Sequence, residues 1–351
     1  MRRLSKAMAL LMGLAVLAAA CGGDDDATGA GGDATTTSAA SSDPGSLVIY
    51  SGRNEELVGP LIEQFETATG IDVEIRYGDT AEMAAQILEE GDNSPADVFF
   101  GQDAGALGAL AAEGRLVELS DEQLGRVPAG LKDDEGRWVG TSGRARVVAY
   151  NTDALSEDDL PDSILDFTDP AWSGRLGWAP TNGSFQAFVT ALRVLEGEDG
   201  ARAWLEGINA NSPRVFDGNT AIVEAVGAGE IDAGFVNHYY LFQLQAQNPD
   251  LAVANNLFGG GDPGGLVNVA GGGILDTASN ADAAQQFIDF LLSAEAQTYF
   301  AESTYEIPLV DGVQPVAGVP TLDDLTLPDI DLNQLDDLAG TLALLTELGI
   351  V

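Results

Sequence analysis

From residue 47 onward the chain alternates short apolar runs with segments of helical period, and this alternation restricts it to an α/β fold. Residues 47–50 have the composition of a buried strand, and Asn54 is a good N-cap for a helix that follows. Apolar residues recur in that helix at helical spacing until Gly70 ends it. Strand and helix then repeat to about residue 113. Such repeats form sheets with right-handed crossovers between strands.

Two long extended runs, residues 144–151 and 265–275, enclose a second α/β set. One strong helix is expected over residues 282–303 and a closing helix over residues 331–349. We predict an α/β periplasmic-binding-protein (Venus flytrap) fold, in which two lobes are joined by two crossing hinge strands and the ligand binds between them. The expected lobes are residues 47–146 with 269–320, and residues 147–268 with 321–351.

Residues 1–21 predict export. A positively charged start precedes an apolar stretch that ends in small residues and is too short to span a membrane comfortably. Cys21, the only cysteine, follows directly, and the residues before it resemble the lipobox of a bacterial or archaeal lipoprotein. Lipidation of Cys21 would anchor the protein at the extracytoplasmic face of the membrane. Ordinary secretion with a free thiol is the alternative.

Residues 22–46 are rich in Gly, Ser, Thr, Ala and Asp, and we expect them to form a disordered tether. If Cys21 is lipidated, the mature chain has no free thiol. Disulfides, cysteine catalysis and thiolate metal sites are then excluded.

The chain is strongly acidic, with 15 Lys and Arg residues against 56 Asp and Glu residues and a formal net charge of −41. This surface repels phosphate backbones, so we expect no nucleic-acid partner. Salt-adapted or high-GC proteomes give acidic chains generally. The charge therefore indicates solubility and steering of cations rather than a particular function.

Four segments share one local pattern, in which an apolar strand is followed by a small or polar turn and then by a helix. They are residues 50–54, 179–185, 215–221 and 235–240. A helix N-terminus offers unpaired N–H groups and a partial positive charge, so it holds anions well. In the best of these loops Gly183 permits close backbone approach and Ser184 adds a hydroxyl. Capping explains any single segment, whereas four together favour a shared site for an oxyanion or another oxygen-rich ligand.

Tyr239 and Tyr240 stand at one of these strand-to-helix turns, where both phenols can point into one cleft. A tyrosinate suits a hard, highly charged cation such as Fe(III), because ionising one phenol at pH 7 costs roughly 4 kcal/mol. The alternatives are an aromatic pair in the core or a platform that stacks on a sugar or an amine. The spacing does not choose between them. By strand alternation we expect His238, the single histidine, to be structural.

Seven segments, in order along residues 47–351, carry a resemblance: YSGRNEELV, SPADVFF, SGRARVV, FDGNTAIVEAVGAGEIDA, NHYY, GDPGGLVNVAG and AQQFIDFLLSAEAQ. In them the chain resembles the periplasmic ferric-ion-binding proteins of ABC importers, and NHYY is the most specific. The resemblance implies a monomer that carries Fe(III) to an importer permease and its ATPase. The iron would be held by Tyr239 and Tyr240 with a synergistic phosphate or carbonate. The anion would be bound by Asn182, Gly183 and Ser184, with Asn219 and Asn237 nearby.

The first lobe departs from this family. Some relatives have a histidine where this chain has Asn54, and a glutamate where it has Gln102 followed by Asp103. Others use a third tyrosine in the anion loop, where this chain has Phe185. We therefore expect Asn54, Gln102 and Asp103 to be at most additional ligands or outer contacts. The iron would bind less tightly than in relatives with the full set.

Arg144 and Arg146, on the first crossing run, are candidates to balance the charge of the anion, and a surface or hinge salt bridge is the alternative. The nearest rival function keeps the fold and binds a phosphonate, a polyamine or another small organic solute. An enzyme is not expected, because the chain has no G-x-S-x-G, H-E-x-x-H, P-loop or EF-hand motif. An inert surface or adhesion lipoprotein would not need a two-lobed fold with converging helix ends.

Overall fold

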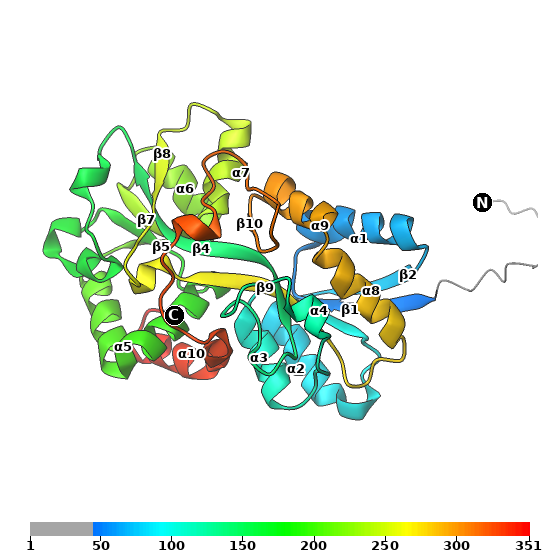
Figure 1. The fold of residues 1–351 in the computed structure, drawn as a ribbon. Helices are drawn as coiled ribbons and strands as arrows, with labels where there is room; N and C mark the ends of the chain where they lie inside the picture. The colour runs from blue at the N-terminus through cyan, green and yellow to red at the C-terminus, as the bar shows by residue number, and fades with distance from the viewer. Residues whose placement is uncertain (1–44) are drawn as a thin grey trace, which may run out of the picture. The chain divides into compact units, whose positions relative to one another are not determined.

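The computed structural model describes residues 45–351 (Figure 1). The predicted export segment, Cys21 and nearly all of the predicted tether lie outside the described residues. Within residues 45–351 no helix is both long and apolar enough to cross a membrane.

The strands are β1 (Ser46–Ser51), β2 (Asp72–Tyr77), β3 (Val98–Gly101), β4 (Val139–Asn151), β5 (Leu176–Trp178), β6 (Arg214–Val215), β7 (Ala233–Asn237), β8 (Val253–Asn256), β9 (Val267–Ile274) and β10 (Ile307–Pro308). The α-helices are α1 (Glu55–Thr69), α2 (Thr80–Glu90), α3 (Ala104–Ala112), α4 (Asp121–Leu124), α5 (Gly183–Ala210), α6 (Asn219–Gly227), α7 (Tyr239–Gln247), α8 (Ala281–Leu291), α9 (Ala294–Tyr299) and α10 (Leu338–Glu347). The short helical turns are η1 (Gly91–Asn93), η2 (Glu157–Asp159), η3 (Ile164–Thr168), η4 (Pro170–Trp172), η5 (Pro263–Gly265), η6 (Phe300–Thr304, a π-helix), η7 (Leu322–Asp324) and η8 (Leu332–Asp336).

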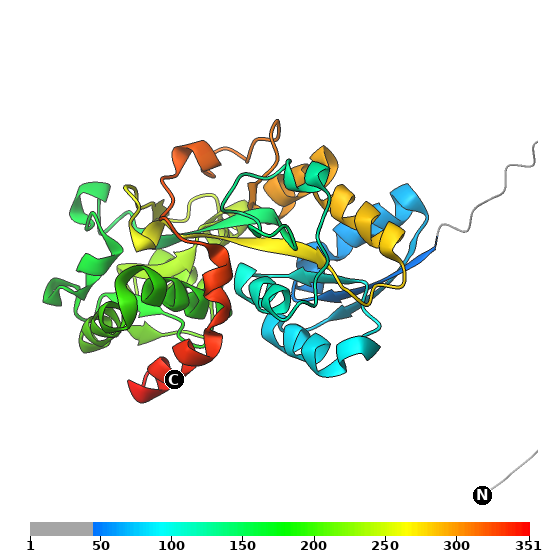
Figure 2. The same ribbon diagram turned by 60° about the horizontal axis from the view of Figure 1, so that its bottom comes forward.

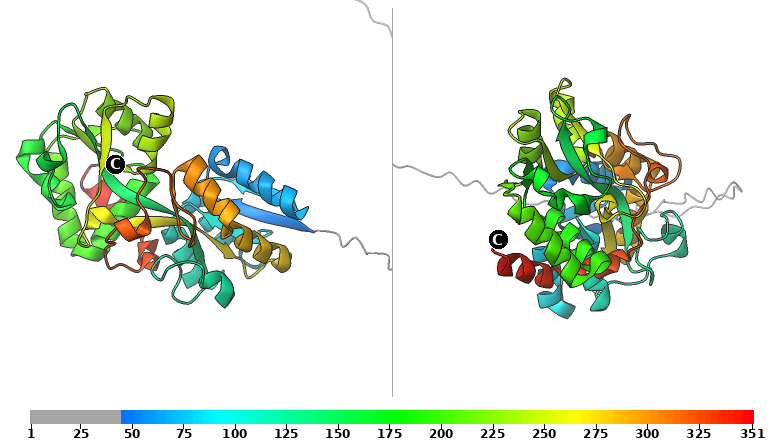
Figure 3. Two further views of the ribbon diagram at one scale, coloured as in Figure 1. Left: turned by 45° about the horizontal axis from the view of Figure 1, so that its top comes forward. Right: turned by 90° about the vertical axis from the view of Figure 1, so that its left-hand side faces the viewer.

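The first half of the sheet consists of β2, β1 and β3, which run parallel, and of β9, which is antiparallel to β3. The buried residues of α1 pack on this half of the sheet. The helix ends at Gly70, as predicted, and Gly70 has a left-handed conformation. Helices α8 and α9 lie beside α1 (Figure 3), and Phe65 of α1 meets Phe287 of α8 with ring centroids 5.1 Å apart. The interior of this half is therefore built from helix-to-sheet packing.

The helix expected over residues 282–303 is interrupted. Helix α8 ends at Leu291, and Ser293 caps a new helix, α9, by accepting a hydrogen bond from the N–H of Ala296. The π-turn η6 then follows. The closing helix expected over residues 331–349 is also two elements, η8 and α10, because Asp337 caps α10. In both places a capping side chain stops one helix and starts the next, which helical periodicity does not register.

The second half of the sheet contains β7, β5 and β6, which run parallel and carry α7, α5 and α6 after them. Its core is rich in aromatic residues. Trp204 of α5 packs edge-on against Phe188 and Phe235, with ring centroids 5.4 Å away in both cases.

Strand β4 joins the two halves. Its residues 139–145 pair with β9, and its residues 146–150 pair with β7. All thirteen of its residues are buried. The strand begins at Val139, five residues before the predicted run, so the crossing segment is longer than the apolar pattern alone suggested. The division into lobes at the predicted boundaries stays a prediction.

The C-terminal segment contacts both halves of the molecule (Figure 2). The indole N–H of Trp138 donates to Asn333 Oδ1 at 2.8 Å, and Asn333 Nδ2 donates to Asp133 Oδ1 at 2.9 Å, which ties η8 to the segment before β4. The same turn packs on α3. Helix α10 packs on α5, where Arg202 pairs with Glu347 at 2.8 Å. Residues 321–351 were predicted to belong to the second lobe, and their η8 part contacts both α3 of the first half and α5 of the second.

The close approach of η8 to α3 can be tested by substituting Gly105. A Cβ at position 105 would lie 2.3 Å from the carbonyl oxygen of Leu335, so Gly105→Ala must displace η8. We expect a loss of about 1–3 kcal/mol of unfolding free energy, measured by urea denaturation. Gly259→Ala is the matched control, since a Cβ there meets nothing within 4 Å. Equal stability of the two variants would contradict the tight packing.

Candidate functional site

Helices α5, α6 and α7 begin at the same edge of the sheet. They follow β5, β6 and β7, which are parallel, so the carboxyl ends of these strands meet at one edge. The first residues of the helices are Gly183, Asn219 and Tyr239. This edge therefore presents the N-termini of three helices, each of which carries a partial positive charge.

The amide side chains at this edge form one hydrogen-bonded chain. Asn182 Oδ1 accepts from the N–H of Ser184 at 3.1 Å and from Asn219 Nδ2 at 3.0 Å. Asn219 Oδ1 accepts from the N–H of Asn237 at 3.1 Å. Gly183 is exposed, and no protein atom comes within 4 Å of where its Cβ would be. The structure thus brings together all five residues predicted for the anion, with open space at Gly183.

Arg146 lies next to this chain, because β4 pairs it with Asn237. Its Nη1 donates to Asn237 Oδ1 at 3.4 Å, and its guanidinium carbon is 5.7 Å and 5.4 Å from the ring centroids of Phe185 and Phe188. Its Nε and Nη2 are buried without a hydrogen-bond partner. Burial lowers the pKa of Arg146 to about 9, which the nearby phenols oppose if they ionise.

The salt bridge considered for the arginines of the crossing run is not observed. Among the ion pairs of residues 45–351 none includes Arg144 or Arg146. A buried cation without a protein counter-ion is costly, and an anion bound at the helix N-termini would neutralise it.

Tyr239 and Tyr240 form a stacked pair at the start of α7, with ring centroids 4.3 Å apart and planes at 29°. Tyr239 is 3 % exposed, and Tyr240 is half-buried. Burial, and then the neighbouring Tyr239, raise the pKa of Tyr240 above its ordinary value. Tyr240 therefore keeps its proton at neutral pH unless a strongly charged cation displaces it.

His238 is fully buried and both of its ring nitrogens are engaged. Its Nδ1 accepts from the N–H of Ala145 at 3.1 Å, and its Nε2–H donates to the carbonyl of Tyr305 at 2.9 Å. Burial lowers the pKa of His238 to about 4, so the imidazole is neutral at pH 7. It has no lone pair free for a metal, in agreement with the expected structural role.

The three possible additional metal ligands in the first half of the molecule make other contacts or none. Asn54 is exposed at the start of α1, and its side chain makes no capping hydrogen bond. The carbonyl of Gln102 accepts from the guanidinium of Arg144. Asp103 Oδ1 accepts from the N–H of Ala106 at 3.3 Å and so caps α3. Within residues 45–351, no hydrogen bond given by the structure joins these three residues to the tyrosines.

Glu306 is a buried charge near the site that sequence patterns did not single out. Its carboxylate pairs with Arg53 at 2.9 Å, and the two side chains are 1 % and 0 % exposed. Arg144 acts on the same region. Burial raises the pKa of Asp103 and of Tyr240 overall, and the charge of Arg144 opposes this rise. After Arg53, Arg144 also helps to hold the pKa of Glu306 below its ordinary value. The one hint of this buried charge in the sequence was that Glu306 stands directly before the apolar run IPLV.

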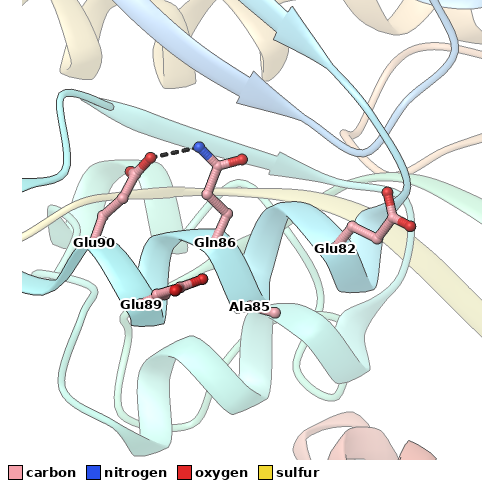
Figure 4. Close-up of a pocket in the computed structure, with 5 residues that line it drawn as sticks. All are labelled: Glu82, Ala85, Gln86, Glu89 and Glu90. Carbon is pink, nitrogen blue, oxygen red and sulfur yellow. Dashed lines mark hydrogen bonds between the residues drawn. The ribbon is translucent and has the colours of Figure 1, made fainter.

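A hollow of about 620 Å³ lies along α2, lined by Glu82, Ala85, Gln86, Glu89 and Glu90 (Figure 4). One helix alone lines it, and none of the candidate site residues does. Residues 45–351 also contain no group of three or more His, Cys, Asp or Glu side chains placed to hold a metal ion.

Comparison with known proteins finds relatives along most of the chain. Residues 60–326 match the family model described as bacterial extracellular solute-binding protein. The chain is 34% identical over 310 residues to the Fe(3+)-binding periplasmic protein of Serratia marcescens, an alignment that covers 87% of this chain and 90% of the relative. It is equally identical to the major ferric iron-binding protein of Neisseria meningitidis serogroup B, with 86% and 92% covered.

Solved structures give the same result. Iron-bound HitA from Pseudomonas aeruginosa matches with a TM-score of 0.81 and 35% identity, covering 87% of this chain and 99% of that one. Trichodesmium FutA in complex with iron and citrate matches with a TM-score of 0.76 and 30% identity, with the same coverage. A fructose-6-phosphate-bound protein, AfuA from Actinobacillus pleuropneumoniae, shares the fold at 19% identity.

These matches confirm the predicted α/β periplasmic-binding-protein fold and the resemblance that the NHYY segment indicated. They also support a solute carrier over an enzyme. With 34% identity over most of its length, the chain belongs to the ferric-ion-binding family of the bacterial extracellular solute-binding proteins.

Proposed function

We propose that this protein captures Fe(III) outside the cytoplasm, with Tyr239 and Tyr240 as its anionic ligands, and delivers it to the permease and ATPase of an ABC importer. One observation carries the proposal. The stacked tyrosine pair begins one of three helices that start at the same edge of the sheet, beside an arginine with unpaired buried nitrogens. Relatives at 34% identity are named as ferric-ion-binding proteins.

The chemistry of the tyrosines favours Fe(III) over divalent cations. Ionising a phenol of ordinary pKa at pH 7 costs roughly 4 kcal/mol, and burial raises the pKa of Tyr240 further. Ca(II) and Mg(II) prefer carboxylates and water, and do not repay that cost. A trivalent ion with hard-donor preference does, because its charge stabilises both phenolates.

A synergistic phosphate or carbonate completes the site in this proposal. It binds the N–H groups at the start of α5, through Asn182, Gly183 and Ser184, with Asn219 and Asn237 next to them. Arg146, with its unpaired buried nitrogens, neutralises the charge of the anion. The charge of Arg144 favours the ionised form of Tyr240. Citrate is a further candidate for this anion, since it accompanies iron in the Trichodesmium complex.

The first half contributes weakly to the metal in this proposal. Asn54 and Gln102 offer only amide oxygens, and Asp103 would have to give up its cap on α3 to reach the ion. Water completes the coordination. We therefore propose a lower affinity for iron than that of a relative with a histidine and a glutamate, and equal affinity against a citrate competitor would contradict this.

Lipidation at Cys21, with residues 22–46 as the tether, would keep this monomeric carrier at the extracytoplasmic face of the membrane, near its permease. Cys21→Ser should release it from membranes, as fractionation would detect. The rival ligands, a phosphonate or a polyamine, would gain little from two adjacent phenols.

The proposal is tested by titration of metal-free protein beginning at Pro44 with ferric citrate, with and without phosphate or bicarbonate. A visible tyrosinate-to-iron charge-transfer band should develop and strengthen with the anion. The variant Gly183→Ala tests the role of the anion. Its methyl group enters open space, so stability should change by less than about 1 kcal/mol, while the anion's effect on the band should fall. No band under any anion would overturn the proposed function.

A further inference from the structure

His238 connects the tyrosine-bearing turn to three separate segments. The backbone N–H of His238 donates to the carbonyl of Ala145 at 3.0 Å, and its ring Nδ1 accepts from the N–H of Ala145. Its carbonyl accepts from Asn255 Nδ2 of β8 at 2.9 Å. Its Nε2–H reaches the carbonyl of Tyr305, between η6 and β10. The residue before the tyrosines thus binds β4, β8 and the η6–β10 segment.

Ala145 is the residue at which β4 changes partner. It is the last residue of β4 to pair with β9, opposite Val267, and Arg146 is the first to pair with β7, opposite Asn237. The N–H of Ala145 meets the imidazole of His238 instead of a strand carbonyl. The imidazole supplies the acceptor that this buried N–H requires.

Tyr305, whose carbonyl accepts the hydrogen bond from the Nε2–H of His238, has an unusual backbone conformation. Its φ is +60°, a left-handed value that few non-glycine residues adopt. Its ring stacks with that of Phe242 of α7, with centroids 6.3 Å apart and planes at 21°. The next residue, Glu306, is fixed by the buried ion pair with Arg53. The acceptor of the Nε2–H bond is therefore anchored on the first half of the molecule.

We infer that His238 is a positioning residue, which fixes the first turn of α7 to β4 and to the η6–β10 segment and so slows the release of the ion held by Tyr239 and Tyr240. The inference rests on the proposed function. His238 does not touch the metal in this role, because both of its nitrogens are engaged. It acts by preventing the tyrosine turn from moving independently of the first half.

The two ring hydrogen bonds can be separated by substitution. An asparagine oxygen occupies about the place of Nδ1, so His238→Asn should keep the bond from Ala145 and lose the one to Tyr305. A glutamine amide reaches about the place of Nε2, so His238→Gln should keep the bond to Tyr305 and lose the one from Ala145. The amide of Ala145 should exchange with solvent faster in His238→Gln than in His238→Asn or in the unaltered protein.

The decisive measurement is the rate at which the iron-loaded full chain loses its charge-transfer band to excess pyrophosphate. In His238→Asn the band should keep its wavelength while its loss is accelerated about tenfold, as expected for one lost hydrogen bond. Ile208→Val is the matched control, since it weakens the buried core of the second half without touching this link. Its dissociation rate should equal that of the unaltered protein.

The outcomes separate the two ideas. If the unaltered protein gives the band and all variants release iron at one rate, the role of His238 is refuted and the proposed function stands. If Ile208→Val accelerates release as much as His238→Asn does, general destabilisation is the cause, and the inference fails too. If the unaltered protein gives no band, the proposed function fails and takes this inference with it.

Discussion

Replacing both Tyr239 and Tyr240 with phenylalanine should abolish the charge-transfer band and remove measurable binding of Fe(III). Even outer partners of metal ligands cost about 10–100-fold in affinity when lost, so loss of both anionic ligands should cost far more. Phenylalanine keeps the stacked rings that are 4.3 Å apart, and the protein should therefore remain folded. Isothermal or spectroscopic titration with ferric citrate measures the effect.

The single variants refine this prediction. Tyr240 is half-buried and burial raises its pKa, so it contributes only when the ion compensates for the cost of ionising it. Either single variant should retain a weaker band, shifted in wavelength. Tyr150→Phe, in β4 and outside the site, is the control and should bind iron normally. Binding that survives the double substitution would show that the pair serves packing alone.

Glu306→Gln should destabilise the fold by about 3–5 kcal/mol, because it leaves the buried guanidinium of Arg53 without its counter-charge. The ion pair is almost completely buried, and Ser142 Oγ and Thr304 Oγ1 donate further hydrogen bonds to the carboxylate at 2.8 Å and 3.1 Å. Urea denaturation at pH 7 measures the loss. Glu347→Gln, which removes an exposed partner of Arg202, should have little effect.

The same pair predicts how stability responds to acid. Burial by itself raises the pKa of Glu306, but Arg53 and then Arg144 lower it overall below its ordinary 4.5. A depressed pKa contributes stability that is present above pH 4.5 and is lost as the pH falls through the lower value of the folded protein. Unfolding curves should therefore show less acid sensitivity in Glu306→Gln than in the unaltered protein. Unchanged acid sensitivity would mean that other carboxylates govern the loss.

Local features were predictable from the sequence because they depend on neighbours along the chain. The strand–helix alternation, the stop at Gly70 and the capped turn at Asn182 follow from periodicity and from short-range capping, and the structure contains them. The tandem tyrosines at the start of α7 were visible for the same reason. Helix ends inside residues 282–303 were missed, since a capping serine looks like any polar residue of a helix surface.

Much of the candidate site depends on residues far apart in the sequence. Asn182 meets Asn219 across 37 positions, and Arg53 meets Glu306 across 253. No local pattern encodes such contacts, because they exist only once the parallel strands lie side by side and β4 changes partner at Ala145. Periodicity and capping therefore predicted most of the strands and helices and the tyrosine turn. The burial of Arg146 without a counter-ion, the use of Asp103 as a cap and the link from His238 to the opposite half arise only from long-range packing.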